Sequence, residues 1–235
     1  MERELFTKLE RWMKKKNRKP LIIQGARQVG KTWIMKEFGA RFYENTVYIN
    51  FDNNKAMKDV FELDFDLKRI LSAIKIEYGK SFQAENTLII FDEIQEAPKA
   101  LASLKYFYEN APQYSIIAAG SLLGVALHQG TSFPVGKVDF LKLCPMSFSE
   151  FLLAVGENGL YETLKAQDYE LINAYAGKYV DLLKKYYYVA ECQRWYRLIL
   201  IPMICMKFVR SRTIFSRTIE EDSASMLPKR LFRVL

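Results

Sequence analysis

The sequence predicts an α/β fold, in which a parallel sheet of about five strands is flanked by helices and followed by a small helical segment. Two observations predict this class. Short apolar runs alternate with stretches of helical periodicity over the first 146 residues, which is typical of successive βαβ units. Half of the 235 residues are hydrophobic and 14% are aromatic, so the chain has ample material for a buried core.

The first elements follow from the spacing of apolar residues. Residues 2–16 predict a helix, because large apolar side chains recur on one face. Residues 19–24 form a short apolar run that enters a glycine, as in a buried parallel strand, and residues 31–38 follow as a helix. Residues 46–51 are β-branched and aromatic, which favours a second strand. Residues 67–78 predict a helix with an inner apolar stripe.

Three further strands complete the predicted sheet. Residues 87–91 form an apolar strand that ends in two acidic residues. A helix follows over residues 99–110, with Pro98 at its start. Residues 115–119 predict a fourth strand that ends at a glycine and a serine, and residues 138–143 predict a weaker fifth strand.

The second half of the chain predicts helices outside the sheet. Ser147 is a good N-cap, and Glu150 three residues later completes a capping box, which predicts a helix over residues 148–155. Asp168 likewise opens a helix that runs to about residue 186. We therefore expect four parts: an N-terminal helix over residues 1–18, a core over 19–146, a helical segment over 147–189 and an atypical tail over 190–235.

A phosphate-binding motif lies between the first predicted strand and the following helix. Residues 25–32 match the pattern G-x-x-x-x-G-K-[ST] in full. Glycines let the backbone wrap so that successive N–H groups face a phosphate, and the helix adds the positive end of its dipole. In this pattern the lysine reaches the β and γ phosphates and the threonine hydroxyl ligates Mg²⁺. The predicted nucleotide-binding residues are Gly25, Ala26, Arg27, Gln28, Val29, Gly30, Lys31 and Thr32.

A metal-side partner for this loop is expected at the end of a neighbouring strand. Four apolar residues bury the strand before Asp92, and Asp92 emerges where it can hold a water on Mg²⁺. Glu93 is then placed to orient or deprotonate an attacking water. Ser121 follows the next strand and is predicted to touch the γ phosphate, while a helix cap is an equal alternative. The predicted catalytic residues are thus Lys31, Glu93 and Ser121, and the predicted metal ligands are Thr32 and Asp92.

Other classes of phosphate-loop protein fit this sequence less well. A GTPase needs Asn-Lys-x-Asp to read guanine, and the Asn-Lys pair at residues 54–55 is followed by Ala-Met. Residues 92–95 look like the D-E-x-Q box of a helicase, yet 235 residues leave no room for a second motor domain. A nucleoside kinase rarely needs an acidic pair at this strand. ATP hydrolysis with Mg²⁺ is therefore the reaction that the sequence favours.

The remaining composition argues against a membrane protein, a zinc-binding protein and a protein stabilised by disulfides. The longest strongly apolar run has nine residues, at 198–206, far below the roughly 20 that span a bilayer. The N-terminus lacks the apolar region of a secretory signal, so we expect a cytoplasmic protein without a membrane partner. Three cysteines and one histidine lack the spacing of a zinc site or the even count of a disulfide framework.

Several stretches together resemble a known family. They are residues 25–32, 91–95 with Pro98, 119–121, 133–138 and 145–152. The chain resembles the prokaryotic AAA-type ATP-binding proteins, in which a P-loop ATPase core is followed by a C-terminal domain of unknown function. The resemblance covers residues 1 to about 189 and implies an AAA-like core that binds ATP and Mg²⁺ at the residues named above. It supplies no arginine finger: Arg27 lies inside the loop, and Arg41 and Arg69 qualify only by residue type.

The tail departs from the pattern of this family. Its members typically continue after a Tyr-rich helix with Gly-Gly-Met-Pro-Glu-Val-Val, whereas residues 189–196 read V-A-E-C-Q-R-W-Y. One extra G after the Val189 codon converts a back-translation of this run into the family sequence. The same shifted frame at residues 224–229 permits Lys-His-Ala-Pro-Lys. We therefore predict that residues 190–235 result from a one-base frameshift; a divergent native tail is the alternative, and sequencing the gene distinguishes the two.

The net charge of +8 does not by itself decide the function. Residues 190–235 carry nine Lys and Arg against four Asp and Glu, so most of the excess belongs to the tail. Three functions stay open: a Mg-dependent ATPase of AAA type that acts as a switch or motor on an unknown partner, a nucleotide-binding module with little turnover, and an ATPase that regulates a nucleic-acid-processing domain lost from this chain. ATP is the expected partner, with a homo-oligomer and DNA left open.

Overall fold

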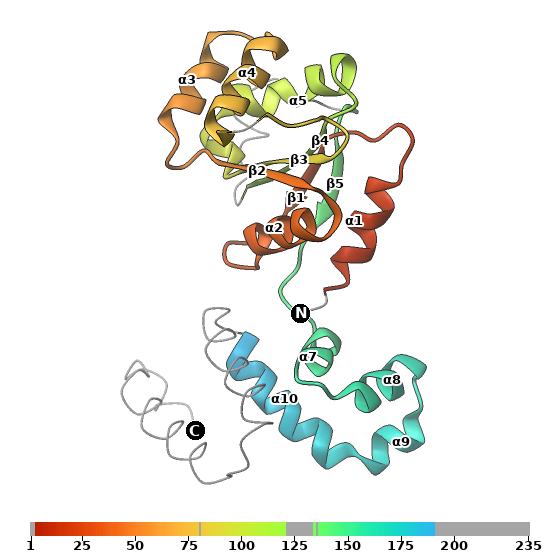
Figure 1. Ribbon diagram of the computed structural model, residues 1–235. Helices are drawn as coiled ribbons and strands as arrows, with labels where there is room; N and C mark the ends of the chain where they lie inside the picture. Colours follow the sequence, from red (N-terminus) through yellow and green to blue (C-terminus); the bar gives the residue numbers. More distant parts are fainter. Residues whose placement is uncertain (1–2, 80, 121–133, 135, 191–235) are drawn as a thin grey trace, which may run out of the picture. The chain divides into compact units, whose positions relative to one another are not determined.

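Five parallel strands form one sheet in the order β2-β3-β4-β1-β5 (Figure 1). They are β1 (Leu21–Gln24), β2 (Asn45–Asn50), β3 (Thr87–Asp92), β4 (Ser115–Gly120) and β5 (Asp139–Lys142). The computed structural model describes residues 3–79, 81–120, 134 and 136–190, all within the first of two units, Met1–Gln193 and Arg194–Leu235. The predicted α/β class and the five predicted strands are confirmed.

Helices cover both faces of the sheet (Figure 1). Helices α1 (Leu5–Met13) and α2 (Lys31–Phe42) pack on one face, where they meet side chains such as Leu88 and Ile90 of β3. Helices α3 (Lys55–Leu63), α4 (Leu67–Tyr78) and α5 (Pro98–Asn110) pack on the other face, where they meet Ile89 and Phe91. Successive residues of β3 point to opposite faces of the sheet, and helices cover both faces. The strand is therefore buried along its whole length, as its unbroken apolar run predicted.

Two helices of the described chain were not predicted. Helix α3 has an amphipathic pattern of only two buried residues, Met57 and Phe61, and its start depends on Asn54, whose side chain accepts a hydrogen bond from the Met57 N–H. Helix α8 (Asn158–Ala166) has a single buried residue, Leu160. Both helices are only nine residues long. In α3, Met57, Val60 and Phe61 follow the helical spacing i, i+3, i+4, so the sequence did contain a signal for this helix.

The helical segment begins as predicted and then differs. Helix α7 (Phe148–Ala154) starts with the predicted capping box between Ser147 and Glu150. The single helix predicted from Asp168 to about residue 186 is wrong, because Tyr175 leaves the helical backbone and separates α9 (Tyr169–Ala174) from α10 (Ala176–Ala190). In α10 the side chain of Tyr179 is buried and its hydroxyl donates to the Leu160 carbonyl at 2.7 Å, so packing on α8 favours the break.

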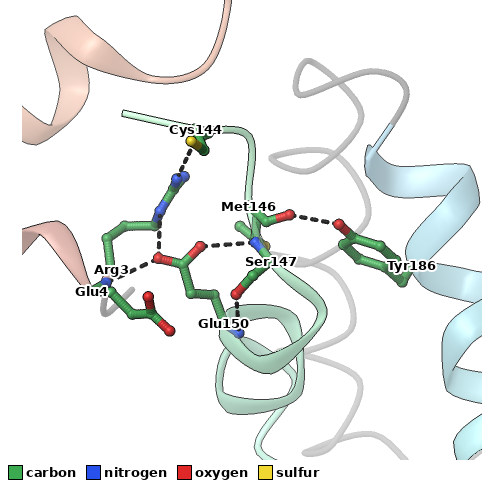
Figure 2. Close-up of polar contacts among 7 residues, drawn as sticks. All are labelled: Arg3, Glu4, Cys144, Met146, Ser147, Glu150 and Tyr186. Carbon is green, nitrogen blue, oxygen red and sulfur yellow. Dashed lines mark hydrogen bonds and ion pairs between the residues drawn. The ribbon is translucent and has the colours of Figure 1, made fainter. Parts of the chain in front are cut away.

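A buried ion pair ties the start of the chain to α7 (Figure 2). Arg3 Nε donates to Glu150 Oε1 at 3.0 Å, and the Arg3 guanidinium also donates to the Cys144 carbonyl at 2.7 Å. The same carboxylate accepts from the backbone N–H groups of Glu4 and Ser147, each at 2.9 Å. Arg3 and Glu150 are both 6% exposed, so this carboxylate has exchanged water for protein donors.

Some sequence predictions lie outside what the fold tests. Ser121, Phe133, Val135 and the tail beyond residue 190 lie outside the described residues. The division of the chain after residues 18, 146 and 189 and the frameshift therefore stay predictions. Among the described residues, none of the helices has the length and apolarity needed to cross a membrane.

Candidate functional site

The predicted phosphate loop connects β1 to α2, as the motif requires. Gly25 packs directly against the residue that follows β5: a Cβ placed on it would lie 2.4 Å from the Leu143 carbonyl oxygen. Gly30 has φ +91°, a left-handed conformation that favours glycine, immediately before α2 begins. Val29 is buried in the core beneath α2 and anchors the loop. The two glycines of the motif are thus set by close packing at one end and by backbone conformation at the other.

Lys31 is held inside this loop. It is the first residue of α2 and is only 6% exposed. Its ammonium donates to the carbonyls of Gly25 at 3.0 Å and Ala26 at 2.7 Å. Burial lowers the pKa of Lys31, while the nearby carboxylates of Glu93 and Asp92 act in the opposite direction. The loop therefore surrounds one cation whose hydrogen bonds can be exchanged for those of an anionic ligand.

Asp92 and Thr32 are brought together although β4 lies between β1 and β3 in the sheet. The Thr32 hydroxyl donates to Asp92 Oδ2 at 2.6 Å. The Tyr48 hydroxyl donates to the same oxygen at 2.9 Å, and the Glu93 N–H donates to Asp92 Oδ1 at 3.0 Å. Asp92 is 2% exposed, so its carboxylate is more enclosed than its place at a strand end suggested. Burial, followed by the charge of Asp92, raises the pKa of Tyr48, so this phenol stays a donor at neutral pH.

Glu93 occupies a left-handed conformation, with φ +50° and ψ +45°. This is an unusual backbone region for a glutamate, and such positions concentrate at functional sites. Its carboxylate accepts a hydrogen bond from Gln95 Nε2 at 2.6 Å. Gln95 belongs to the short helix η1 (Ile94–Glu96) that follows β3. The turn therefore directs Glu93 away from the strand and fixes its side chain with a neutral donor.

The other residues considered for the site are Ser121, Arg41 and Arg69. Strand β4 ends at Gly120, opposite Gln24 of β1, but Ser121 lies outside the described residues and its role stays a prediction. Arg41 pairs with Glu37 at 2.8 Å, and Arg69 pairs with Asp64 at 2.6 Å. Both of these arginines are therefore engaged within this chain.

Sequence reasoning missed Tyr48 and Gln95. Tyr48 contacts Asp92 only because the parallel register of β2 and β3 places Asn50 opposite Asp92, and this register is not encoded in a local motif. Gln95 contacts Glu93 because the left-handed turn brings them together. The D-E-x-Q spacing of residues 92–95 is a sequence signal for Gln95, but neither a helicase box nor the family resemblance gives this glutamine a role at the site.

The residues at this site fit a magnesium nucleotide chemically. Mg²⁺ prefers oxygen ligands and usually takes only one or two from the protein when phosphates supply others. The Thr32 hydroxyl and the Asp92 carboxylate are such oxygens, already in contact beside the loop. The loop adds a lysine ammonium and the N-terminus of a twelve-residue helix, which both favour an anion.

The family model described as the AAA domain matches residues 17–152, more than half of the chain. None of the curated proteins matches the chain. Among solved structures, a Walker-type ATPase of Pyrococcus abyssi is 19% identical with a TM-score of 0.42, over 66% of this chain and 58% of that one. A structure of the Drosophila ORC bound to DNA is 15% identical with a TM-score of 0.53, over 97% of this chain and 68% of that one. This second likeness supports the fold.

Proposed function

The chain belongs to the AAA domain family, and on that premise we propose that it binds ATP with Mg²⁺ and hydrolyses the bond between the β and γ phosphates, which yields ADP and phosphate. Membership confirms the resemblance to AAA-type P-loop ATPases. The chain spans 58% of the length of the Walker-type ATPase, so the partner on which the ATPase acts belongs to the proposal too. We place the activity in the cytoplasm, where ATP and Mg²⁺ are abundant.

Each site residue has a part in this proposal. The backbone of residues 25–30 and the α2 N-terminus hold the phosphates, and Lys31 exchanges its bonds to the Gly25 and Ala26 carbonyls for phosphate oxygens. Thr32 and Asp92 hold Mg²⁺, which when bound neutralises charge on the phosphates. Glu93 orients a water and accepts its proton.

The contact between Thr32 and Asp92 is the observation that carries the proposal. It joins the loop helix to the end of a strand 60 residues later in the sequence and places two magnesium-type ligands side by side. A solvated turn or a helix cap at Asp92 would not bury the carboxylate to 2% exposure against this hydroxyl.

A second function, nucleotide binding with slow turnover, has one observation in its favour. Gln95 donates to Glu93 Oε2, so this oxygen must change partners or share its lone pairs before it accepts a proton. Replacing Gln95 by alanine separates the two functions: faster phosphate release in this variant supports a restrained glutamate, and slower release supports a glutamine that orients Glu93 for catalysis.

The test combines nucleotide affinity with phosphate release. Lys31→Ala removes charge-assisted hydrogen bonds worth about 1.5–3 kcal/mol, so a fluorescent ATP analogue should bind roughly 10- to 150-fold more weakly. Lys55→Ala is the matched control, because Lys55 is an exposed lysine that also opens a helix. Glu93→Gln should keep the affinity and lower Mg²⁺-dependent phosphate release at least 100-fold. Equal affinity of the wild-type chain and Lys31→Ala would reject the site. Added duplex DNA tests the nucleic-acid partner through stimulated release.

A further inference from the structure

Tyr48 lies on the edge strand β2 and reaches the end of the neighbouring strand. Residues 48 and 50 point to the same face of the sheet, because side chains alternate along a strand. Asn50 lies directly opposite Asp92, so Tyr48 is its diagonal neighbour two residues back. A diagonal distance of this kind is within reach of an aromatic side chain. The hydroxyl spans it and donates to Asp92 Oδ2 at 2.9 Å.

The donors around the Asp92 carboxylate have different relations to the proposed metal. Thr32 donates to Oδ2 and is itself a proposed ligand of Mg²⁺. The Glu93 N–H donates to Oδ1 from the adjoining peptide. Tyr48 donates to Oδ2 and has no proposed contact with metal or nucleotide. It is therefore a side-chain donor whose action on the metal runs through Asp92.

The ring of Tyr48 has contacts of its own that fix its position. Lys36 lies on α2, one turn after Thr32, and its ammonium is 3.6 Å from the ring centroid. A cation over a tyrosine ring at this distance is attractive. The ring also packs against the core on the α1 and α2 side of the sheet. The phenol thus presents its hydroxyl to Asp92 from a fixed direction.

We propose that Tyr48 is a positioning residue that sets the affinity of the site for Mg²⁺ by orienting the Asp92 carboxylate. This inference rests on the proposed function and deepens it. Groups that hydrogen-bond a metal-binding side chain fix its orientation, and their removal typically lowers metal affinity 10- to 100-fold. Nucleotide binding without metal depends on the loop backbone and on Lys31, whose ammonium donates to the Gly25 and Ala26 carbonyls, so we expect it to be independent of this hydroxyl.

A purely structural role gives a different result. A half-buried tyrosine hydroxyl often finds a partner simply to satisfy its hydrogen bond. Its loss would then lower the thermal stability and leave the dependence of nucleotide binding on Mg²⁺ unchanged. The two roles are therefore separated by a magnesium titration.

The experiment uses the full chain with Tyr48→Phe, which keeps the ring and removes the hydroxyl. Tyr78→Phe is the matched control, since the Tyr78 hydroxyl donates to Asn45 Oδ1 at 3.3 Å, away from Asp92. The affinity for a fluorescent ATP analogue is measured in EDTA and then across a Mg²⁺ titration. In EDTA both variants should match the wild-type chain within twofold. The half-point of this titration is the Mg²⁺ concentration at which half of the change in affinity has occurred. It should rise about tenfold in Tyr48→Phe and stay unchanged in Tyr78→Phe.

An unchanged half-point in folded Tyr48→Phe overturns the inference while leaving the proposed function intact. A wild-type chain that binds no nucleotide overturns both. Should Tyr48→Phe fail to fold, Lys36→Met decides, because Lys36 is exposed and this change frees the ring without removing the hydroxyl. A rise of two- to threefold in its half-point supports the inference, and no change rejects it.

Discussion

Replacing Glu150 by glutamine changes the buried pair that ties the N-terminal segment to α7 (Figure 2). Oε1 accepts from Arg3 Nε and from the Glu4 N–H, and Oε2 accepts from the Ser147 N–H. A glutamine has one oxygen and one NH₂ group, so its NH₂ must face a donor on one side or the other. The substitution therefore removes the charge opposite Arg3 and also places an NH₂ donor against at least one N–H donor.

The expected loss of stability follows from the burial of both partners. Removing one member of a buried ion pair costs about 3–5 kcal/mol, because the other charge is left buried without compensation. For a chain of 150 to 250 residues each kcal/mol lowers Tm by about 2–4 °C, so Glu150→Gln should lower Tm by roughly 6–20 °C. Thermal unfolding followed by circular dichroism, with urea denaturation as a second measurement, detects a change of this size.

Glu157→Gln is the matched control in the same helical segment. Glu157 accepts from Lys178 Nζ at 2.7 Å, but the two side chains are 27% and 52% exposed. Exposed pairs contribute about 0–1 kcal/mol, so this variant should stay within a few degrees of the wild-type chain. Equal small losses in both variants would refute the reasoning. Arg3→Met combined with Glu150→Gln should be more stable than Glu150→Gln alone, because it removes the unpaired charge.

Two further substitutions test packing and a buried phenol. Gly39→Ala places a Cβ 2.4 Å from Thr46 Oγ1, so it should lower the free energy of unfolding by about 1–3 kcal/mol in urea denaturation. In the control Gly159→Ala, the replaced helical glycine has open space around it, so the free energy of unfolding should rise by up to about 1 kcal/mol. Equal effects of the two substitutions would contradict the prediction. Tyr179→Phe leaves the Leu160 carbonyl without its donor and should cost about 1–2 kcal/mol at pH 7. Burial raises the pKa of Tyr179 above its ordinary 10.0, so this stabilisation is present below about pH 10 and is lost as the pH rises further. The difference between the two chains should therefore narrow above pH 10, and a widening difference would contradict it.

The parts of the site that the sequence predicted are contiguous patterns. The loop of residues 25–32 and the acidic pair at the end of β3 are recognisable because the chemistry needs those residue types at fixed spacing. The strands were predicted for a similar reason, since burial on both faces requires an unbroken apolar run. Helices α3 and α8 were missed because both are short, although Met57, Val60 and Phe61 of α3 follow the helical spacing i, i+3, i+4.

Contacts that depend on register or on a turn could not be predicted in this way. Tyr48 meets Asp92 because two strands pair with a particular offset, and Gln95 meets Glu93 because the backbone turns left-handed between them. The helix breaks at Tyr175, and Tyr179 beyond the break bonds to the Leu160 carbonyl of α8, a tertiary contact that a continuous helical pattern does not reveal. Each of these is a tertiary effect that overrides a local preference.

One face of α2 connects the fold to the chemistry of the site. Thr32, Lys36 and Gly39 are spaced by four and three residues, so they share this face. They meet Asp92, Tyr48 and Thr46 respectively, in an order that runs back along the strands from their carboxyl ends. The distance between Thr32 and Asp92 is thus set by the packing of the whole helix on β2, including the close approach that Gly39 allows. A change about 10 Å along the helix, at 1.5 Å per residue, acts on the two proposed metal ligands without touching either.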